Sequence, residues 1–232
     1  MTSINYTTIL LVVAVGTVAI IVFGTFFGVA WINSNPGHYS YTVTTEGLAG
    51  YEGGPGAEII VPLPMRDGEP VFSKDELDNQ QFGSWTSTVV ETPYGTMLAF
   101  RSDGEDLTDI TAEFSRRYEP GELKIANIRE ESLSPLTCDH SDGPATWTNG
   151  TPDVPDYSSV ISLPDDLAPL GPDAGDIVID IDVGVSEGLN HSILGDTYRV
   201  RMHESIPPDV RGDIIVSVDI TQYADGAWVS VD

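Results

Sequence analysis

The residues Cys138, Asp139 and His140 place a thiol, a carboxylate and an imidazole next to one another in the sequence. A nucleophilic site needs such groups aligned by the fold, and they usually come from positions far apart in the chain. The tripeptide also lies in a segment rich in Pro and Gly, with no oxyanion motif nearby. The pattern therefore does not predict catalysis at this position.

Histidine and carboxylate side chains are the other groups that could bind a metal ion. No two of the four histidines have the i, i+4 spacing of a helical zinc site, and a single cysteine excludes a CxxC motif. Two acidic groups could offer oxygen ligands to calcium, but neither has EF-hand spacing; they are Asp103, Glu105, Asp106 and Asp109, and Asp173 with Asp176. We expect solvated carboxylates and surface histidines (His38, His140, His191 and His203), with no metal and no cofactor.

Sequence motifs of the common enzyme classes are also missing. The chain contains no G-x-S-x-G, no Walker sequence and no Rossmann fingerprint. Glycoside hydrolysis needs a pair of carboxylates, and the abundance of acid gives no way to choose one pair. The sequence therefore predicts a protein that is not an enzyme.

The charge of the chain is strongly negative. Its 232 residues include 36 Asp and Glu against 10 Lys and Arg, a formal net charge of -26, and Lys74 and Lys124 are the only lysines. No basic stripe exists to neutralise phosphates, so we expect no nucleic-acid partner. The pairs Arg116-Arg117 and Arg199/Arg201 are expected to balance local acid.

The acidic composition makes the stability of the chain depend on salt and resembles that of proteins from salt-loving archaea. Such a surface repels itself at ordinary ionic strength, whereas at molar salt the Debye length falls to ~3 Å and the repulsion is largely screened. An acidic, lysine-poor chain with 41% hydrophobic residues resembles the membrane-anchored, β-rich surface proteins of salt-loving archaea or of their viruses. The resemblance is compositional and rests on no family motif. A disordered acidic tail is excluded by the hydrophobic content and the strand-like alternation.

Residues 9–32 form a run without a charged side chain, preceded by a short leader, residues 1–8. As a helix the run would be ~36 Å long, enough to cross a ~30 Å hydrocarbon core. A cleaved signal peptide is the alternative, with Gly28 and Ala30 near a cleavage site, but the leader lacks positive charge and the run is too long. We predict an uncleaved transmembrane helix with Trp31 at the interface and the lipid bilayer as a partner.

Two further sets of residues are candidates for helix–helix packing in the membrane and for glycosylation. Gly24 and Gly28 have the small-xxx-small spacing that lets two spanning helices approach, which predicts self-association through this face. The sequons at Asn149 and Asn190 are candidate glycan acceptors and favour an extracellular domain. Lysine and arginine do not fix the orientation, because the first such residue is Arg66.

The rest of the chain alternates with a period of two and shows no sustained helical periodicity. We expect β-rich halves at 36–133 and 157–232, separated by a loop or linker at 134–156, in one β-sandwich or in two domains. Inward-facing positions are expected at Ile110, Ala112, Phe114 and Tyr118, at Ile177, Ile179, Ile181 and Val183, and at Tyr198, Val200 and Met202. A short helical turn is expected in 73–82 with Ser73 as cap and Glu76 three residues on. About ten strands favour an all-β sandwich or jelly-roll-like fold.

The sequence as a whole favours a non-enzymatic, membrane-anchored surface or structural protein of a halophilic archaeon. Self-association or a protein partner is expected at the exposed domain. Alternatives are a capsid or spike protein of a membrane-containing virus of such archaea, a surface-tethered hydrolase, or a ligand-binding domain. The last should show a pocket lined by aromatic residues such as Trp85, Trp147 or Trp228, although tryptophans of this kind usually lie in the core.

Overall fold

The fold was obtained as a computed structural model. It describes residue 17 and residues 37–54, 56–66, 68–104, 106–119, 133–139, 156–172, 174–186, 197–224 and 227–230. Apart from Thr17, the leader and the expected transmembrane run lie outside this part of the chain, as do Gly24, Gly28, Asn149 and Asn190. Within the described residues no helix has the length and apolarity that a membrane crossing requires.

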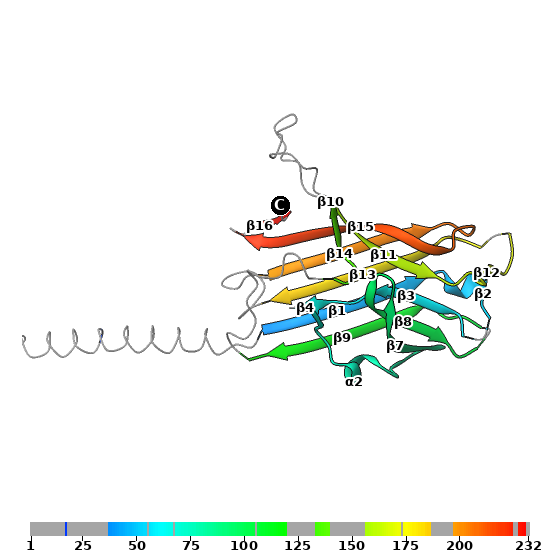
Figure 1. The fold of residues 1–232 in the computed structure, drawn as a ribbon. Helices are drawn as coiled ribbons and strands as arrows, with labels where there is room; N and C mark the ends of the chain where they lie inside the picture. Colours follow the sequence, from blue (N-terminus) through cyan, green and yellow to red (C-terminus); the bar gives the residue numbers. More distant parts are fainter. Residues whose placement is uncertain are drawn as a thin grey trace, which may run out of the picture.

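The described chain is mainly antiparallel β-structure (Figure 1), which confirms the all-β prediction. Its elements are β1 Gly37–Glu46, η1 Leu48–Gly50, β2 Tyr51–Glu52, β3 Glu58–Pro62, β4 Met65–Arg66, β5 Glu69–Pro70, α2 Lys74–Leu77, β6 Gln81–Phe82, β7 Trp85–Thr92, β8 Gly95–Ser102, β9 Ile110–Tyr118, β10 Thr137–Asp139, β11 Asp156–Leu163, β12 Ala168–Pro169, β13 Ile177–Ser186, β14 Thr197–Ile206, β15 Gly212–Ala224 and β16 Ala227–Ser230.

Twelve of the described strands belong to a single sheet with the order β6-β7-β8-β3-β11-β15-β14-β13-β1-β9, while β10 pairs with β11 and β16 with β15. Strand β15 joins the two parts of this sheet. Its residues 212–218 pair with β11, and its residues 218–223 pair with β14 on the other side. The sheet therefore combines strands from both halves of the chain: the block β11-β15-β14-β13 lies between β3 and β1, since β3 pairs with β11 and β1 pairs with β13.

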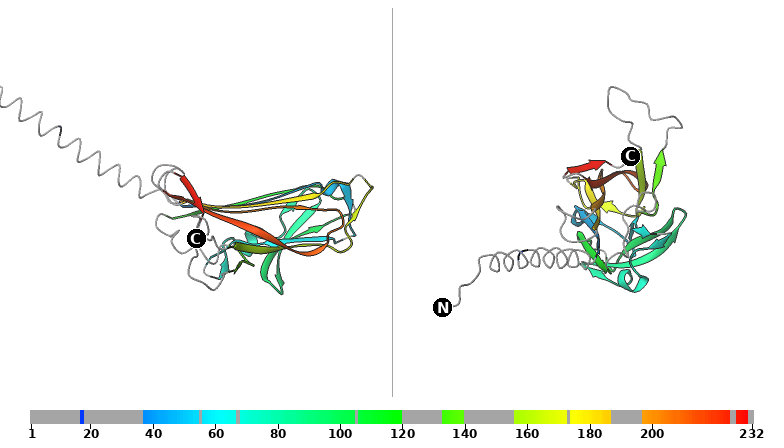
Figure 2. Two further views of the ribbon diagram at one scale, coloured as in Figure 1. Left: turned by 90° about the horizontal axis from the view of Figure 1, so that it is seen from above. Right: turned by 90° about the vertical axis from the view of Figure 1, so that its left-hand side faces the viewer.

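The sheet curls around one core until its two ends approach each other (Figures 1 and 2). The end strands β6 and β9 are in contact, and the rings of Phe82 and Phe114 lie 5.8 Å apart across the gap. This arrangement is nearly barrel-like. It follows from the right-handed twist of long antiparallel strands, which curls an open sheet as strands are added.

The core confirms the predicted alternation. In β9, β13 and β14 all the positions expected to face inward are buried, and they form one cluster with residues from both halves of the chain. Trp85 is fully buried and its indole N–H donates to the carbonyl oxygen of Thr108 at 2.6 Å. Trp85 is therefore a core residue, as tryptophans of this kind usually are. Trp147 and the side chain of Trp228 lie outside the described part.

The short helix α2 begins at the cap that the sequence predicts. The backbone N–H and the hydroxyl of Ser73 both donate to Glu76 Oε2 at 2.7 Å, and a capping box is formed. The segment after α2 then covers the outer edge of β7: the Asn79 amide donates to the Ser87 carbonyl oxygen, and the Ser87 amide donates to that of Gln80. This places α2 beside the gap between the two ends of the sheet.

The described residues of the expected linker form backbone hydrogen bonds with the sheet. Ser134 and Leu63 exchange two backbone hydrogen bonds, and β10 pairs with the start of β11. Residues 140–155 lie outside the described part.

Candidate functional site

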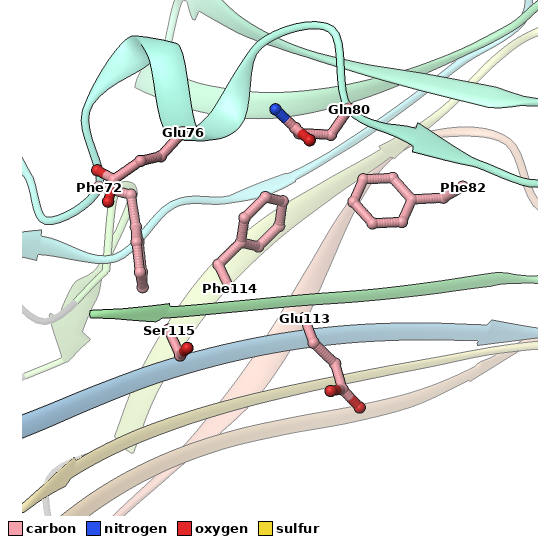
Figure 3. A pocket seen from close by; sticks show the side chains of 7 residues that line it. All are labelled: Phe72, Glu76, Gln80, Phe82, Glu113, Phe114 and Ser115. Atoms are coloured by element: carbon pink, nitrogen blue, oxygen red, sulfur yellow. The ribbon is translucent and has the colours of Figure 1, made fainter. Parts of the chain in front are cut away.

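A pocket of about 270 Å³ lies at the seam between the two ends of the sheet (Figure 3). One wall is β9, which has β1 as its one paired neighbour among the described strands. The other wall is the segment that runs from α2 into β6. The residues lining the pocket are Phe72, Glu76, Gln80, Phe82, Glu113, Phe114 and Ser115.

The inner side of this pocket is aromatic. The ring of Phe114 lies 5.9 Å from that of Phe72 and 5.8 Å from that of Phe82. Behind them, the ring of Tyr41 stacks on Phe114 at 5.8 Å, and its hydroxyl donates to the carbonyl oxygen of Pro62 at 2.7 Å. The rings are packed in the core on one side and line the pocket on the other (Figure 3), but Phe72 and Phe114 are buried, so the pocket has a rigid aromatic floor with little exposed apolar surface.

The rim of the pocket is acidic, with one arginine nearby. Burial raises the pKa of Glu76, but the two hydrogen bonds from Ser73 and the charge of Arg116 outweigh it and leave this pKa below its ordinary value. The Arg116 guanidinium lies 3.9 Å from the Glu76 carboxylate and donates to the carbonyl oxygen of Val71 at 2.8 Å. Glu113 is exposed on the other wall.

The chemistry of these groups suits the binding of a small ligand. The lining holds two carboxylates, one amide, one hydroxyl and three phenyl rings; the Glu113 side chain points to the other side of β9 from the rings (Figure 3). Phenyl faces beside carboxylates can hold an apolar group or an organic cation. An extended segment could also pair with the outer edge of β9.

A second group of charged residues lies on the outer face of β13 and β14. The Asp182 carboxylate accepts hydrogen bonds from Arg199, and Arg201 Nε lies 3.3 Å from the same carboxylate. This confirms the expectation that these two arginines balance local acid. Two residues further along the same register, His203 Nδ1 lies 2.6 Å from Asp180 Oδ1, and this hydrogen bond and the Asp180 charge raise the pKa of His203.

Three described members of the acidic clusters singled out in the sequence accept hydrogen bonds from the protein, while Glu105 and Asp173 lie outside the described part. Asp109 accepts a hydrogen bond from the amide of Leu48 at 2.9 Å, and Asp103 accepts one from the Thr86 hydroxyl at 3.0 Å. Asp176 accepts one from the Ser205 hydroxyl at 2.7 Å. Among the described residues, no three His, Cys, Asp or Glu side chains converge as metal ligands would.

Most of the other candidate site residues lie outside the part of the chain that the structure describes. Cys138 and Asp139 belong to β10 by their backbone, and their side chains and His140 lie outside the described part. The same holds for the sequons at Asn149 and Asn190 and for Gly24 and Gly28. These predictions therefore stay predictions.

The seam pocket itself was not predicted from the sequence. Phe72 lies in an irregular segment and Phe82 in a two-residue strand, so neither is part of a periodic pattern. The one available signal was the Ser73 and Glu76 cap, which locates α2 but not the strand opposite it.

No protein-family model, curated protein or solved structure matches this chain.

Proposed function

We propose that this chain is a non-enzymatic, membrane-anchored structural or interaction protein of a halophilic archaeon. In this proposal residues 9–32 cross the bilayer, and the curled β-sheet forms a sandwich or jelly-roll-like domain outside the cell. The domain binds a protein partner or further copies of the chain.

The observation that carries the proposal is the short distance between the apolar run and the folded sheet. Strand β1 begins at Gly37, and residues 33–36 separate it from the end of the run. Four extended residues span at most ~14 Å, so an anchored domain would be held against the bilayer. A compact domain at the end of a very short tether suits side-by-side packing at a surface.

The acidic outer face supports the saline environment. Exposed carboxylates lie on several strands, such as Glu46, Glu91 and Glu113, outside one apolar core. The outward Asp180 and Asp182 of β13 are instead paired with basic side chains of β14. The strands thus keep an ordinary core and place the acid outside. Screening at molar salt allows like-charged copies of such a domain to approach one another.

Protease treatment of intact cells or particles tests the proposal. We expect peptides from residues 37–232 to disappear from the membrane fraction, while the peptide containing residues 9–32 stays with the lipid. Loss of no peptide would place the domain inside the cell and contradict the surface role. Recovery of the shaved protein from virus particles rather than from the cell envelope would favour a capsid or spike role.

A ligand-binding role is the second candidate, and the seam pocket favours it. Its lining includes three phenylalanines beside two glutamates, whereas Trp85, which the sequence offered for such a pocket, lies in the core. Soaking the protein with tetramethylammonium and following the Phe114 ring signals by NMR would test this role. Unchanged signals would remove the organic-cation form of it.

A further inference from the structure

The end of the barrel at which β1 begins carries arginine and tyrosine side chains. In the register of β1 and β9, His38 lies opposite Arg117 and Tyr39 lies opposite Arg116. Arg66 reaches the same end from β4. Its guanidinium carbon lies 5.3 Å from the centre of the Tyr118 ring, and that of Arg116 lies 5.4 Å from it.

The two ends of the barrel differ in charge. Among the described residues this end also carries acid: Glu69 lies opposite Arg66 in the β4–β5 register, Glu76 lies near Arg116 and Glu119 follows Tyr118, so three described arginines and three described glutamates lie there. The described residues of the opposite end are mainly acidic: the turn after β1 contacts Asp109 and Asp176, and the backbones of Glu52 and Asp106 form an isolated β-bridge. The described cations of that end are Arg101, bonded to Glu58, and Arg211, stacked over Tyr51.

The direction of β1 decides which end faces the bilayer. The strand starts at Gly37, beside the arginines, and its ten residues extend for ~33 Å toward the acidic end. If residues 9–32 are the anchor, residues 33–36 hold the arginine end within ~14 Å of the headgroups.

We propose that this end is a headgroup-binding surface, in which Arg66, Arg116 and Arg117 bind the phosphates of anionic lipids. This inference rests on the proposed function, because it needs the anchor. Guanidinium groups match phosphate oxygens in pairs of hydrogen bonds. At molar salt such pairs act at contact range only, and the short tether supplies the high local concentration that contact binding needs. The strands then stand upright on the bilayer, with the acidic end outward.

Arginine footprinting on the full chain tests the surface. The protein is reconstituted in lipid nanodiscs of phosphatidylcholine, with or without phosphatidylglycerol, and modified with phenylglyoxal; the rate at each arginine is read by mass spectrometry. We expect phosphatidylglycerol to slow the modification of Arg66, Arg116 and Arg117 several-fold. Arg101, at the opposite end in the same molecule, should react at an unchanged rate.

Two variants and one control ion sharpen the result. Arg66→Gln with Arg117→Gln should return Arg116 to its rate in phosphatidylcholine, whereas Arg101→Gln should leave Arg116 protected. Inorganic phosphate added to phosphatidylcholine discs should give no protection, and protection by it would overturn the assignment to lipid.

The outcomes also separate this inference from the anchor. A chain that elutes with the discs but shows equal arginine rates in both lipids overturns the headgroup surface alone. Equal slowing at Arg101 overturns it as well. A chain that does not elute with the discs overturns the anchor, and the headgroup surface with it.

Discussion

Replacing Phe114 by alanine should weaken the closure of the sheet more than any change on its outer face. The ring is 8% exposed and lies within 6 Å of three other rings, those of Tyr41, Phe72 and Phe82. Truncation of a buried phenylalanine costs ~3–5 kcal/mol, and aromatic pairs contribute ~0.5–1.5 kcal/mol each beyond the buried area. We expect Phe114→Ala to lower the free energy of unfolding by ~4 kcal/mol, a large part of the ~5–15 kcal/mol of a typical domain.

Urea titration of the full chain in detergent at molar salt measures this loss, with the fluorescence of buried Trp85 as a signal. Phe114→Leu keeps most of the volume but removes the ring contacts, so we expect a loss of ~1–2 kcal/mol. Ile215→Ala is the matched surface control; its side chain is 76% exposed, and the change should stay within ~0.5 kcal/mol. A loss below ~1 kcal/mol for Phe114→Ala would refute the view that this aromatic cluster joins the two ends of the sheet.

Three further predictions concern the charged surface. Transfer from molar salt to 0.1 M salt should lower the melting temperature measured by near-ultraviolet circular dichroism. The Debye length grows from ~3 to ~10 Å, so the repulsion within the net charge of -26 is no longer screened. An unchanged melting temperature would show that the acidic composition is not an adaptation to salt. In the same urea assay, Asp182→Asn should lower the free energy of unfolding by about 1 kcal/mol at low salt and by less at high salt, because Arg199 and Arg201 lose the carboxylate that they share, on a side chain that is about one-third exposed. An equal loss at both salt concentrations would contradict an electrostatic origin. The pKa of His203 is raised beside Asp180, so the pair of protonated His203 and Asp180 stabilises the fold fully below the ordinary histidine pKa of 6.5, and this stabilisation is lost as the pH rises through the raised pKa of the folded state. His203→Gln should remove this loss from the pH dependence of the free energy of unfolding, and an identical pH profile would exclude the pair as its source.

Local patterns in the sequence predicted much of the fold because burial of one sheet face imposes a period of two. The rows Ile177–Val183 of β13 and Ile110–Phe114 of β9 are buried at alternate positions as expected. The Ser73 and Glu76 cap follows from local hydrogen bonding within four residues, and it was likewise predictable.

In strand β8, alternation of apolar and polar residues does not identify the buried face. Met97, Leu98, Ala99 and Phe100 are all buried, although alternate residues point to opposite faces. Across the outer face, Met97 pairs with Pro62 and Val90, and Tyr94 donates a hydrogen bond to Asp213 from the hairpin tip. Of these neighbours Pro62 and Asp213 lie far away in the sequence, and a local pattern does not encode them.

Strand order and the seam depend on pairings of long sequence separation. The bridge between Ser162 and Ile60 joins the two halves of the chain, and nothing in either segment specifies the other as its partner. The pocket in turn needs Phe72 and Phe114 to meet across the two ends of the sheet. Its residues became recognisable as a site only once the sheet order was known.

In the proposed function, residues 9–32 remain in the mature protein as a lipid-embedded anchor. The most direct measurement is the mass of the N-terminal peptide from the mature chain, recovered after an alkaline wash of the membranes and flotation with lipid. We predict a peptide that still contains the apolar run, found in the floating fraction. A chain that starts beyond residue 30 and stays in the wash would contradict the claim.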